Sequence, residues 1–223
     1  MDRRTHPNDV TPRRGFLTRV AASTMAIGLT GLGSAPARAA AGAEDGPDWP
    51  GTLKGRHRQV VDAYAPNDGF PLAFAFTFVA TNGPASAGVV PATAVVVLRH
   101  VAFPLALDHA MWQKYKIGES LSILDPETKA PAVKNPFLQA KPGVLLVDDM
   151  AIDRLLANGA VIGACGIALK MLSSKLAQNA GMSAEEAAKE WAANVISGIT
   201  VIPSGTWGLN RAQEQGCTYC AGG

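Results

Sequence analysis

Three cysteines, Cys165, Cys217 and Cys220, are the side chains of this chain best suited to covalent chemistry. Cys165 closes an apolar run over residues 160–165 and precedes a stretch with helical periodicity over residues 166–178. At a turn from strand to helix, a sulfur atom faces unpaired amide groups and the positive end of the helix dipole, which favours the thiolate. Persulfide transfer and disulfide exchange both require the thiolate. The competing interpretation is a buried structural cysteine, because free cysteine is among the most buried residue types.

The pair Cys217 and Cys220 has the spacing of a redox motif but not its setting. A redox CxxC opens a helix, whereas this one follows a helix and is expected on a strand. In an extended chain, residues three apart have Cα atoms roughly 10 Å apart, which is beyond the reach of a disulfide. The pair also lacks the histidine of a haem-attachment CxxCH. Three roles stay open for it: structural cysteines, a resolving partner for Cys165, or metal ligands.

Polar residues are also expected at the carboxyl ends of the strands, where ligands bind in open α/β sheets. Besides Cys165, these cleft residues are Asn67, Arg99, His100, Gly166, Ser204 and Gly205. Arg99 suits an anion and His100 a proton or a metal, although capping the sheet edge is their more ordinary role. A set of Cys165, His100 and either Cys217 or Cys220 would suit zinc or copper. No local ligand spacing supports that set, and the sequence requires no cofactor.

The remaining candidates are expected to be structural. Asp62 is the carboxylate most suited to partial burial, paired with Arg56, Arg58 or Arg99. The residues expected to be structural, in the core or in subunit contacts, are His57, His109, Trp112, Tyr115 and Trp191. The chain has no phosphate-binding glycine loop, no GxSxG, no HExxH and no paired catalytic carboxylates, which disfavours hydrolases and nucleotide enzymes.

The framework for these residues follows from hydrophobic periodicity. Strands are predicted over residues 57–64, 92–98, 160–165, 199–203 and 217–220. Helices are predicted over residues 70–82, 105–116, 149–157, 166–178, from 183 onward with a capping box, and over 206–215. Strands alternating with helices predict one α/β domain with a mostly parallel five-stranded sheet flanked by helices. The proline-rich residues 118–147 are predicted to form a long surface excursion.

The first residues of the chain have the pattern of a twin-arginine export signal. Arg13 and Arg14 precede Phe16 and Leu17, then comes an apolar stretch over residues 20–32, and residues 37–39 suit a signal peptidase. The apolar stretch is shorter than the ~20 residues that span a bilayer. We therefore predict a signal over residues 1–39, a linker over 40–51 and a domain over 52–223. This organisation places the protein in the periplasm or elsewhere outside the cytoplasm, with membrane contact during export alone.

Export also changes the charge of the protein. Residues 1–39 hold six arginines and two aspartates, so the rest of the chain has 14 basic and 16 acidic residues and a charge near −2. A nucleic-acid footprint needs clustered lysine and arginine, which argues against nucleic-acid binding. An odd number of cysteines in an exported protein leaves at least one free, ligated or paired between chains.

Three segments together resemble the DsrE-like sulfur-relay family: residues 163–169 around Cys165, residues 201–205 and residues 213–219. The resemblance covers roughly residues 55–221. It implies a five-stranded α/β fold, assembly as a homo-oligomer (trimer or hexamer), and a persulfide carried on the cysteine after the third strand, which is Cys165 here. The excursion over residues 118–147 is longer than the family pattern.

The sequence thus carries two hypotheses of different classes. In the first, an exported thiol or sulfur-relay protein carries persulfide or exchanges thiols at Cys165, with a donor or acceptor protein as partner. In the second, the same fold is a non-enzymatic oligomeric module that binds a small ligand or a metal.

Overall fold

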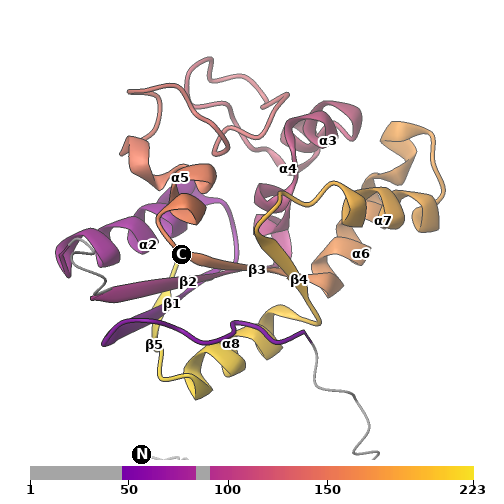
Figure 1. The fold of residues 1–223 in the computed structure, drawn as a ribbon. Coiled ribbons are helices and arrows are strands. Elements are labelled where there is room, and N and C mark those ends of the chain that lie inside the picture. Colours follow the sequence, from indigo (N-terminus) through magenta and orange to yellow (C-terminus); the bar gives the residue numbers. More distant parts are fainter. Residues whose placement is uncertain (1–46, 84–90) are drawn as a thin grey trace, which may run out of the picture. The chain divides into compact units, whose positions relative to one another are not determined.

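The computed structural model describes residues 47–83 and 91–223 and confirms the predicted α/β class (Figure 1). The strands are β1 (His57–Ala63), β2 (Ala92–Leu98), β3 (Val161–Cys165), β4 (Ile199–Ile202) and β5 (Thr218–Ala221). They form one sheet in the order β4-β3-β2-β1-β5, and every neighbouring pair is parallel. The predicted signal over residues 1–39 lies outside the described residues, so it stays a prediction.

The centre of the sheet is built from the most apolar strands. All seven residues of β2 are buried, as the continuous run of β-branched and small side chains requires of a strand covered on both faces. Val96 of β2 lies opposite Val61 of β1 and Ile162 of β3. On the other side of β1, Val61 lies opposite Cys220 of β5.

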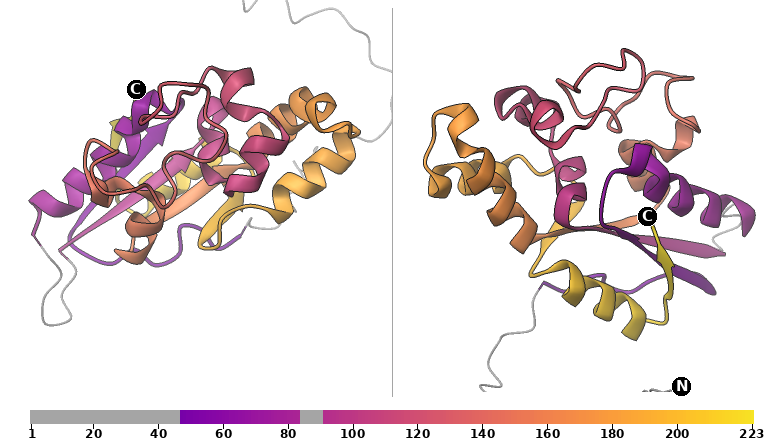
Figure 2. Two further views of the ribbon diagram at one scale, coloured as in Figure 1. Left: turned by 90° about the horizontal axis from the view of Figure 1, so that it is seen from above. Right: turned by 180° about the vertical axis from the view of Figure 1, so that it is seen from behind.

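The helices cover the two faces of the sheet unequally (Figure 2). On one face lie α2 (Phe70–Thr81), α5 (Ile152–Ala157), α6 (Gly166–Leu176) and α7 (Ala184–Ala193), and on the other lies α8 (Gly205–Glu214). The chain steps from β1 to β4 in one direction and then returns past all of them to β5. Because parallel crossovers are right-handed, the reversed step must place α8 on the opposite face.

One helix prediction needs correction. Residues 105–116 do not form one helix: a 3-10 helix η2 (His100–Ala106) ends before α3 (His109–Lys114), and α4 (Ile117–Leu121) follows. The physical reason is Asp108, whose carboxylate caps α3 by accepting a hydrogen bond from the Met111 amide at 3.2 Å. The remaining short helices are η1 (Asn67–Gly69), η3 (Asp148–Met150) and η4 (Ala177–Ala180).

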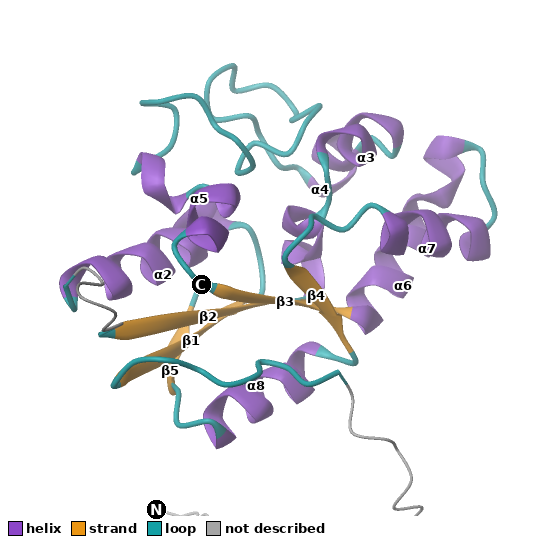
Figure 3. Ribbon diagram, viewed as in Figure 1, coloured by secondary structure: helices purple, strands orange, loops and turns teal. Residues whose placement is uncertain are grey.

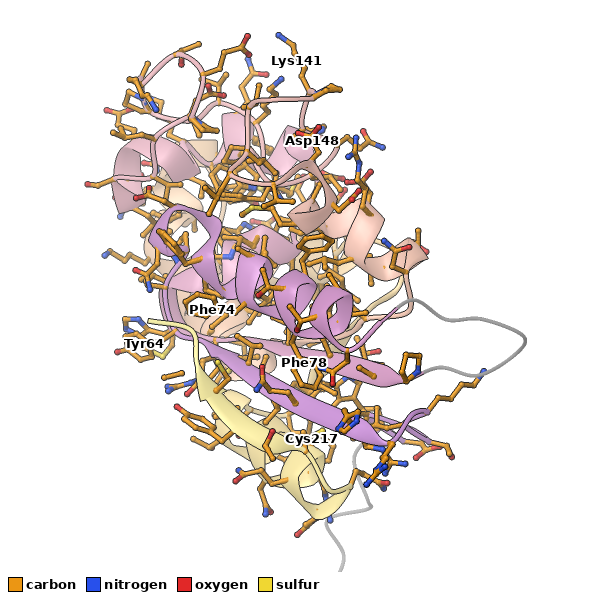
Figure 4. The ribbon with its side chains drawn as sticks, turned by 90° about the vertical axis from the view of Figure 1, so that its left-hand side faces the viewer. Tyr64, Phe74, Phe78, Lys141, Asp148 and Cys217 are labelled. Atoms are coloured by element: carbon orange, nitrogen blue, oxygen red, sulfur yellow. The ribbon has the colours of Figure 1, made fainter. Side chains whose placement is uncertain are left out.

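The predicted surface excursion over residues 118–147 begins instead after α4, which ends at Leu121, and the rest of it is anchored to the core. Figure 3 shows it as a loop, and Figure 4 labels Lys141 in its outer part. Its buried Asn135 donates hydrogen bonds to the carbonyl oxygens of Leu105 and Leu107, at 2.9 and 2.8 Å, and accepts one from the Phe137 amide. Such a satisfied buried amide holds an irregular segment in one place.

A second, smaller core lies between the sheet and α8, and it corrects the predicted linker. Trp49 is buried there with Leu53, Val60 and Ile202. A Cβ atom at Gly163 of β3 would lie 2.6 Å from the Trp49 ring, so glycine is needed for the indole to reach the sheet. The domain therefore includes Trp49 and does not begin at residue 52.

The aromatic residues expected in the core are found there. Trp112, Tyr115 and Trp191 are fully buried, and Trp191 packs edge-on against Tyr115. The Tyr115 hydroxyl donates to Glu190 at 2.7 Å, and Lys114 pairs with the same carboxylate at 2.6 Å. These bonds join α3 to α7. No helix within the described residues has both the length and the apolar character needed to cross a bilayer.

The Glu190 network predicts a loss of stability in acid. The hydrogen bond from Lys114, followed by that from Tyr115, holds the pKa of Glu190 below its ordinary 4.5. A carboxyl whose folded pKa is depressed stabilises the fold above the ordinary value, and this contribution disappears as the pH falls through the folded value. We expect Glu190→Gln to flatten the decline in the free energy of unfolding below pH 4.5, measured by urea denaturation. Glu185→Gln, which removes an exposed carboxylate of the same helix, should follow the parent protein. An unchanged acid decline in Glu190→Gln would contradict the assignment.

Candidate functional site

The site lies at the carboxyl ends of the neighbouring strands β3 and β4, which are followed by helices on opposite faces of the sheet. After β3 the chain enters α6 on one face, and after the adjacent β4 it enters α8 on the other. Ligands of open α/β sheets bind in the crevice that such a switch creates at the carboxyl ends of the strands. A pocket of about 410 Å³ opens there, within the size range of small-molecule sites.

The pocket brings together most of the cleft residues expected from the sequence. Its lining consists of Tyr64, Arg99, His100, Val101, Cys165, Ile167, Ala168, Met171, Leu172, Lys175, Ser204, Gly205 and Thr206. Gly166 stands behind this lining, where a Cβ atom would lie 3.0 Å from the Ile202 carbonyl oxygen. Lys175 and the apolar residues of α6 were missed in the sequence analysis. The spacing of Ile167, Met171 and Lys175, which repeats every four residues, is the signal that would have placed them on one helix face.

Cys165 stands at the junction of β3 and α6 and borders the pocket. It is the N-cap residue of α6, and its Sγ accepts a hydrogen bond from the Ala168 amide at 3.3 Å. The residue is 6% exposed and lines the pocket. The Sγ atom therefore lies next to the Ala168 amide, at the end of α6 where the helix dipole is positive.

Arg99 is held beside the pocket by a bidentate ion pair. Its Nε and Nη2 donate to the two carboxylate oxygens of the buried Asp62, at 2.6 and 2.8 Å. The Tyr219 hydroxyl donates to the same carboxylate at 2.9 Å. These hydrogen bonds with Asp62 raise the pKa of Arg99 and of Tyr219. The pairing selects Arg99 from the three arginines that the sequence left open, and it fixes the guanidinium at the pocket wall.

Arg99 belongs to a stack of three side chains in the pocket wall, together with Tyr64 and His100. The Arg99 guanidinium lies 4.7 Å from the Tyr64 ring centre, and His100 stacks on the same tyrosine with ring centres 4.2 Å apart. His100 has a φ angle of +49°, a left-handed conformation that non-glycine residues seldom adopt. Such conformations cluster at functional sites, where the surroundings hold them.

Gly205 allows the helix α8 to begin next to Arg99. A Cβ atom at position 205 would lie 2.6 Å from both Cβ and Cδ of Arg99. Ser204 caps the helix, and its Oγ accepts a hydrogen bond from the Trp207 amide at 3.1 Å. The start of α8 and the start of α6 therefore meet at the pocket.

Asn67 was expected in the cleft, but the structure places it elsewhere. It follows β1 in a left-handed conformation, and its side-chain amide donates to the Gly222 carbonyl oxygen at 3.3 Å. It is absent from the pocket lining, because η1 turns the chain away towards α2. His57 and His109 also lie outside the lining.

Cys217 and Cys220 lie on opposite faces of the sheet, and neither lines the pocket. Cys217 packs in the core beneath α8, whereas Cys220 packs against the core on the α2 face. Figure 4 shows Cys217 where β5 begins, away from Tyr64 at the other end of the strands. β3 and β5 are three strand intervals apart, roughly 14 Å, which exceeds disulfide reach between Cys165 and Cys220. All three cysteines are free.

The same separation removes the metal set considered from the sequence. Cys165 and His100 share the pocket, but Cys217 and Cys220 do not join them. Across residues 47–83 and 91–223, no group of three or more histidine, cysteine or acidic side chains is arranged to hold a metal ion.

The thiols should differ sharply in reactivity. Burial raises the pKa of the Cys217 thiol to about 11, although the charge of Arg58 acts in the opposite direction. Since the neutral form persists until the pH approaches that value, we expect native protein at about pH 8 to resist iodoacetamide at Cys217. Cys220, half-buried on the same segment, is the matched comparison. Peptide mass spectrometry after timed alkylation gives both rates, and equal rates would contradict the expectation.

No family model, no curated protein and no solved structure matches this chain.

Proposed function

We propose that this protein is an exported sulfur carrier of the DsrE-like kind, in which Cys165 takes up sulfane sulfur as a persulfide and passes it to another thiol. The observation that carries the proposal is the position of the Cys165 sulfur. This sulfur atom borders the pocket at the carboxyl ends of β3 and β4 and accepts a hydrogen bond from the Ala168 amide of α6. Arg99 and His100 line the same pocket.

The proposed chemistry needs no oxidant or reductant. The Cys165 thiolate attacks the sulfane sulfur of the donor, an S–S bond forms, and the donor's own S–S bond breaks with its electron pair leaving on the donor. In the second step, an acceptor thiolate attacks the outer sulfur, and Cys165 leaves as the thiolate. Arg99 and the amides at the start of α6 would stabilise the negative charge that sulfur carries throughout.

The isolation of Cys165 favours a carrier over an internal dithiol oxidoreductase. A resolving cysteine must approach to disulfide distance, and neither Cys217 nor Cys220 does so in this fold. A persulfide on Cys165 would therefore persist until an external acceptor arrives. Export by the twin-arginine route and assembly as a homo-oligomer belong to the same proposal and rest on the sequence alone.

The direct test is sulfur loading followed by transfer. Reduced protein lacking residues 1–39 is given inorganic polysulfide, freed of excess reagent, and digested for peptide mass spectrometry. We expect a gain of about 32 Da, one sulfur atom, on the Cys165 peptide, and its loss on addition of a low-molecular-weight thiol. Sulfur distributed equally over Cys165 and Cys220 would overturn the proposal.

A second candidate is a small-ligand binding module without transfer chemistry. The observation in its favour is the apolar wall of the pocket, formed by Val101, Ile167, Ala168, Met171 and Leu172. The sulfur-loading test distinguishes the two candidates. A protein that binds a small ligand but gains no sulfur on Cys165 supports the binding module.

A further inference from the structure

The pocket restricts what can reach the sulfur atom. Cys165 is 6% exposed, whereas Ile167 and Met171 at the pocket rim are 54% and 63% exposed. A nearly buried thiol that lines a pocket of about 410 Å³ is more accessible to a small molecule than to a cysteine on a rigid protein surface. The first donor to react with it should therefore be small.

The charges around the pocket select an anion. Two basic side chains, Arg99 and Lys175, line the cavity together with His100, and among the described residues no carboxylate does. Part of the Arg99 charge is balanced by Asp62 behind it, but Lys175 has no ion pair within the described residues. A cationic cavity without acidic lining attracts and retains an anionic ligand.

Hydrogen-bond donors converge on the same place. The amides of the first two residues of α6 and α8, helices of 11 and 10 residues, have no acceptor inside their helices, whereas the third amide of each donates to its cap residue, Cys165 or Ser204. Ser204 and Thr206 hydrogen-bond to each other at 3.1 Å, which leaves one hydroxyl hydrogen of the pair to donate at the pocket edge. Several donors along one pocket suit a group with several oxygen atoms, such as a sulfonyl group.

The rest of the wall is apolar and stays accessible. Ile167 and Met171 stand four residues apart on α6, immediately after Cys165, with Val101 and Leu172 beside them. Exposed apolar side chains next to a reactive group indicate binding of an apolar moiety, because their burial by a ligand gains free energy. An inorganic donor such as thiosulfate has no such moiety.

From these features we infer that the sulfur donor is an organic thiosulfonate anion, R–SO₂–S⁻, whose group R lies along Ile167 and Met171. This inference rests on the proposed sulfur-carrier function. The Cys165 thiolate attacks the terminal sulfur, the new S–S bond forms, and the bond between the two sulfur atoms of the donor breaks. The electron pair leaves on the sulfonyl group as the sulfinate, R–SO₂⁻, so the step is balanced without a further reactant. The free helix amides, the remaining hydroxyl hydrogen of the Ser204–Thr206 pair and Arg99 would hold the sulfinate oxygens.

The test compares donors that differ in the apolar group. Rates of sulfur loading on Cys165 are measured with benzenethiosulfonate, methanethiosulfonate and inorganic thiosulfate, with inorganic polysulfide as the reference. We expect benzenethiosulfonate to load with a second-order rate constant at least about tenfold above that of methanethiosulfonate, since a buried ring gains more than a buried methyl group. Thiosulfate should be slower still.

Two serine variants make the comparison specific. Met171→Ser removes an apolar side chain from the pocket, and Leu146→Ser removes one that is 70% exposed outside it. We expect Met171→Ser, but not Leu146→Ser, to lower the ratio of the benzenethiosulfonate rate to the polysulfide rate by about tenfold. Equal rates for the benzene and methane donors, or an unchanged ratio in Met171→Ser, overturn the inference while the carrier function stands. Failure of polysulfide to load Cys165 overturns both.

Discussion

Replacing Cys165 with serine is expected to abolish sulfur loading while leaving the fold intact. The serine hydroxyl is not ionised at neutral pH and cannot carry a persulfide, so loading at this position should fall below detection. Cys165 is the N-cap residue of α6, and serine is among the residues preferred at that position. The serine oxygen can therefore accept the hydrogen bond of the Ala168 amide that the sulfur accepts in the parent protein. The free energy of unfolding should therefore stay within about 1 kcal/mol of the parent value. Peptide mass spectrometry and urea denaturation give the two results separately.

Cys220→Ser is the matched control for this substitution. Cys220 is a half-buried free thiol outside the pocket, so its loss should leave the loading of Cys165 unchanged. If Cys165→Ser protein still takes up one sulfur per chain with the parent rate, Cys165 is not the carrier. A variant that fails to fold would show a lowered unfolding midpoint and would contradict the predicted capping by serine.

Replacing Trp49 with alanine should cause the largest loss of stability. The indole is buried between the sheet and α8, and Gly163 and Gly208 lie against its ring. Both glycines leave room that the indole fills, so its removal opens a cavity that neither can close. Truncation of a buried tryptophan costs about 3–5 kcal/mol, which is a large part of the stability of a domain this size. Urea denaturation followed by circular dichroism measures the change.

The neighbouring Trp207 provides the comparison for Trp49. Its ring lies 6.4 Å from that of Trp49 but is only partly buried. We expect Trp207→Ala to cost clearly less than Trp49→Ala, because less apolar surface returns to water. A chain that begins at residue 52 should lose as much stability as Trp49→Ala. Full stability of that shorter chain would show that the domain does not need the indole.

The strands and most helices could be predicted because their signals are local. The continuous β-branched run of β2 agrees with a strand buried on both faces, and Ser183 and Ser204 cap α7 and α8 as their positions indicate. The segment over residues 105–116 was mistaken for one helix. Its apolar residues fit helical spacing, but the capping bond of Asp108 begins a separate helix there.

The linker boundary could not be predicted for a different reason. Trp49 follows glycine, proline and aspartate, a composition typical of linkers. Its burial depends on two glycines more than 100 residues away, Gly163 and Gly208, which leave space for the ring. Periodicity within a window of sequence carries no information about such a contact.

Taken by itself, the sequence determined the α/β class and placed Cys165, Arg99, His100 and Ser204 at the ends of strands. These residues come together because the carboxyl ends of parallel strands all lie at one edge of the sheet. The tertiary structure decided the partners. It paired Arg99 with Asp62, whose carboxylate also accepts a hydrogen bond from Tyr219. It also placed Asn67 outside the cleft and put Cys217 and Cys220 on opposite faces of the sheet. The physical reason is that backbone patterns are set by neighbouring residues, whereas ion pairs and burial depend on which distant side chains share the same space.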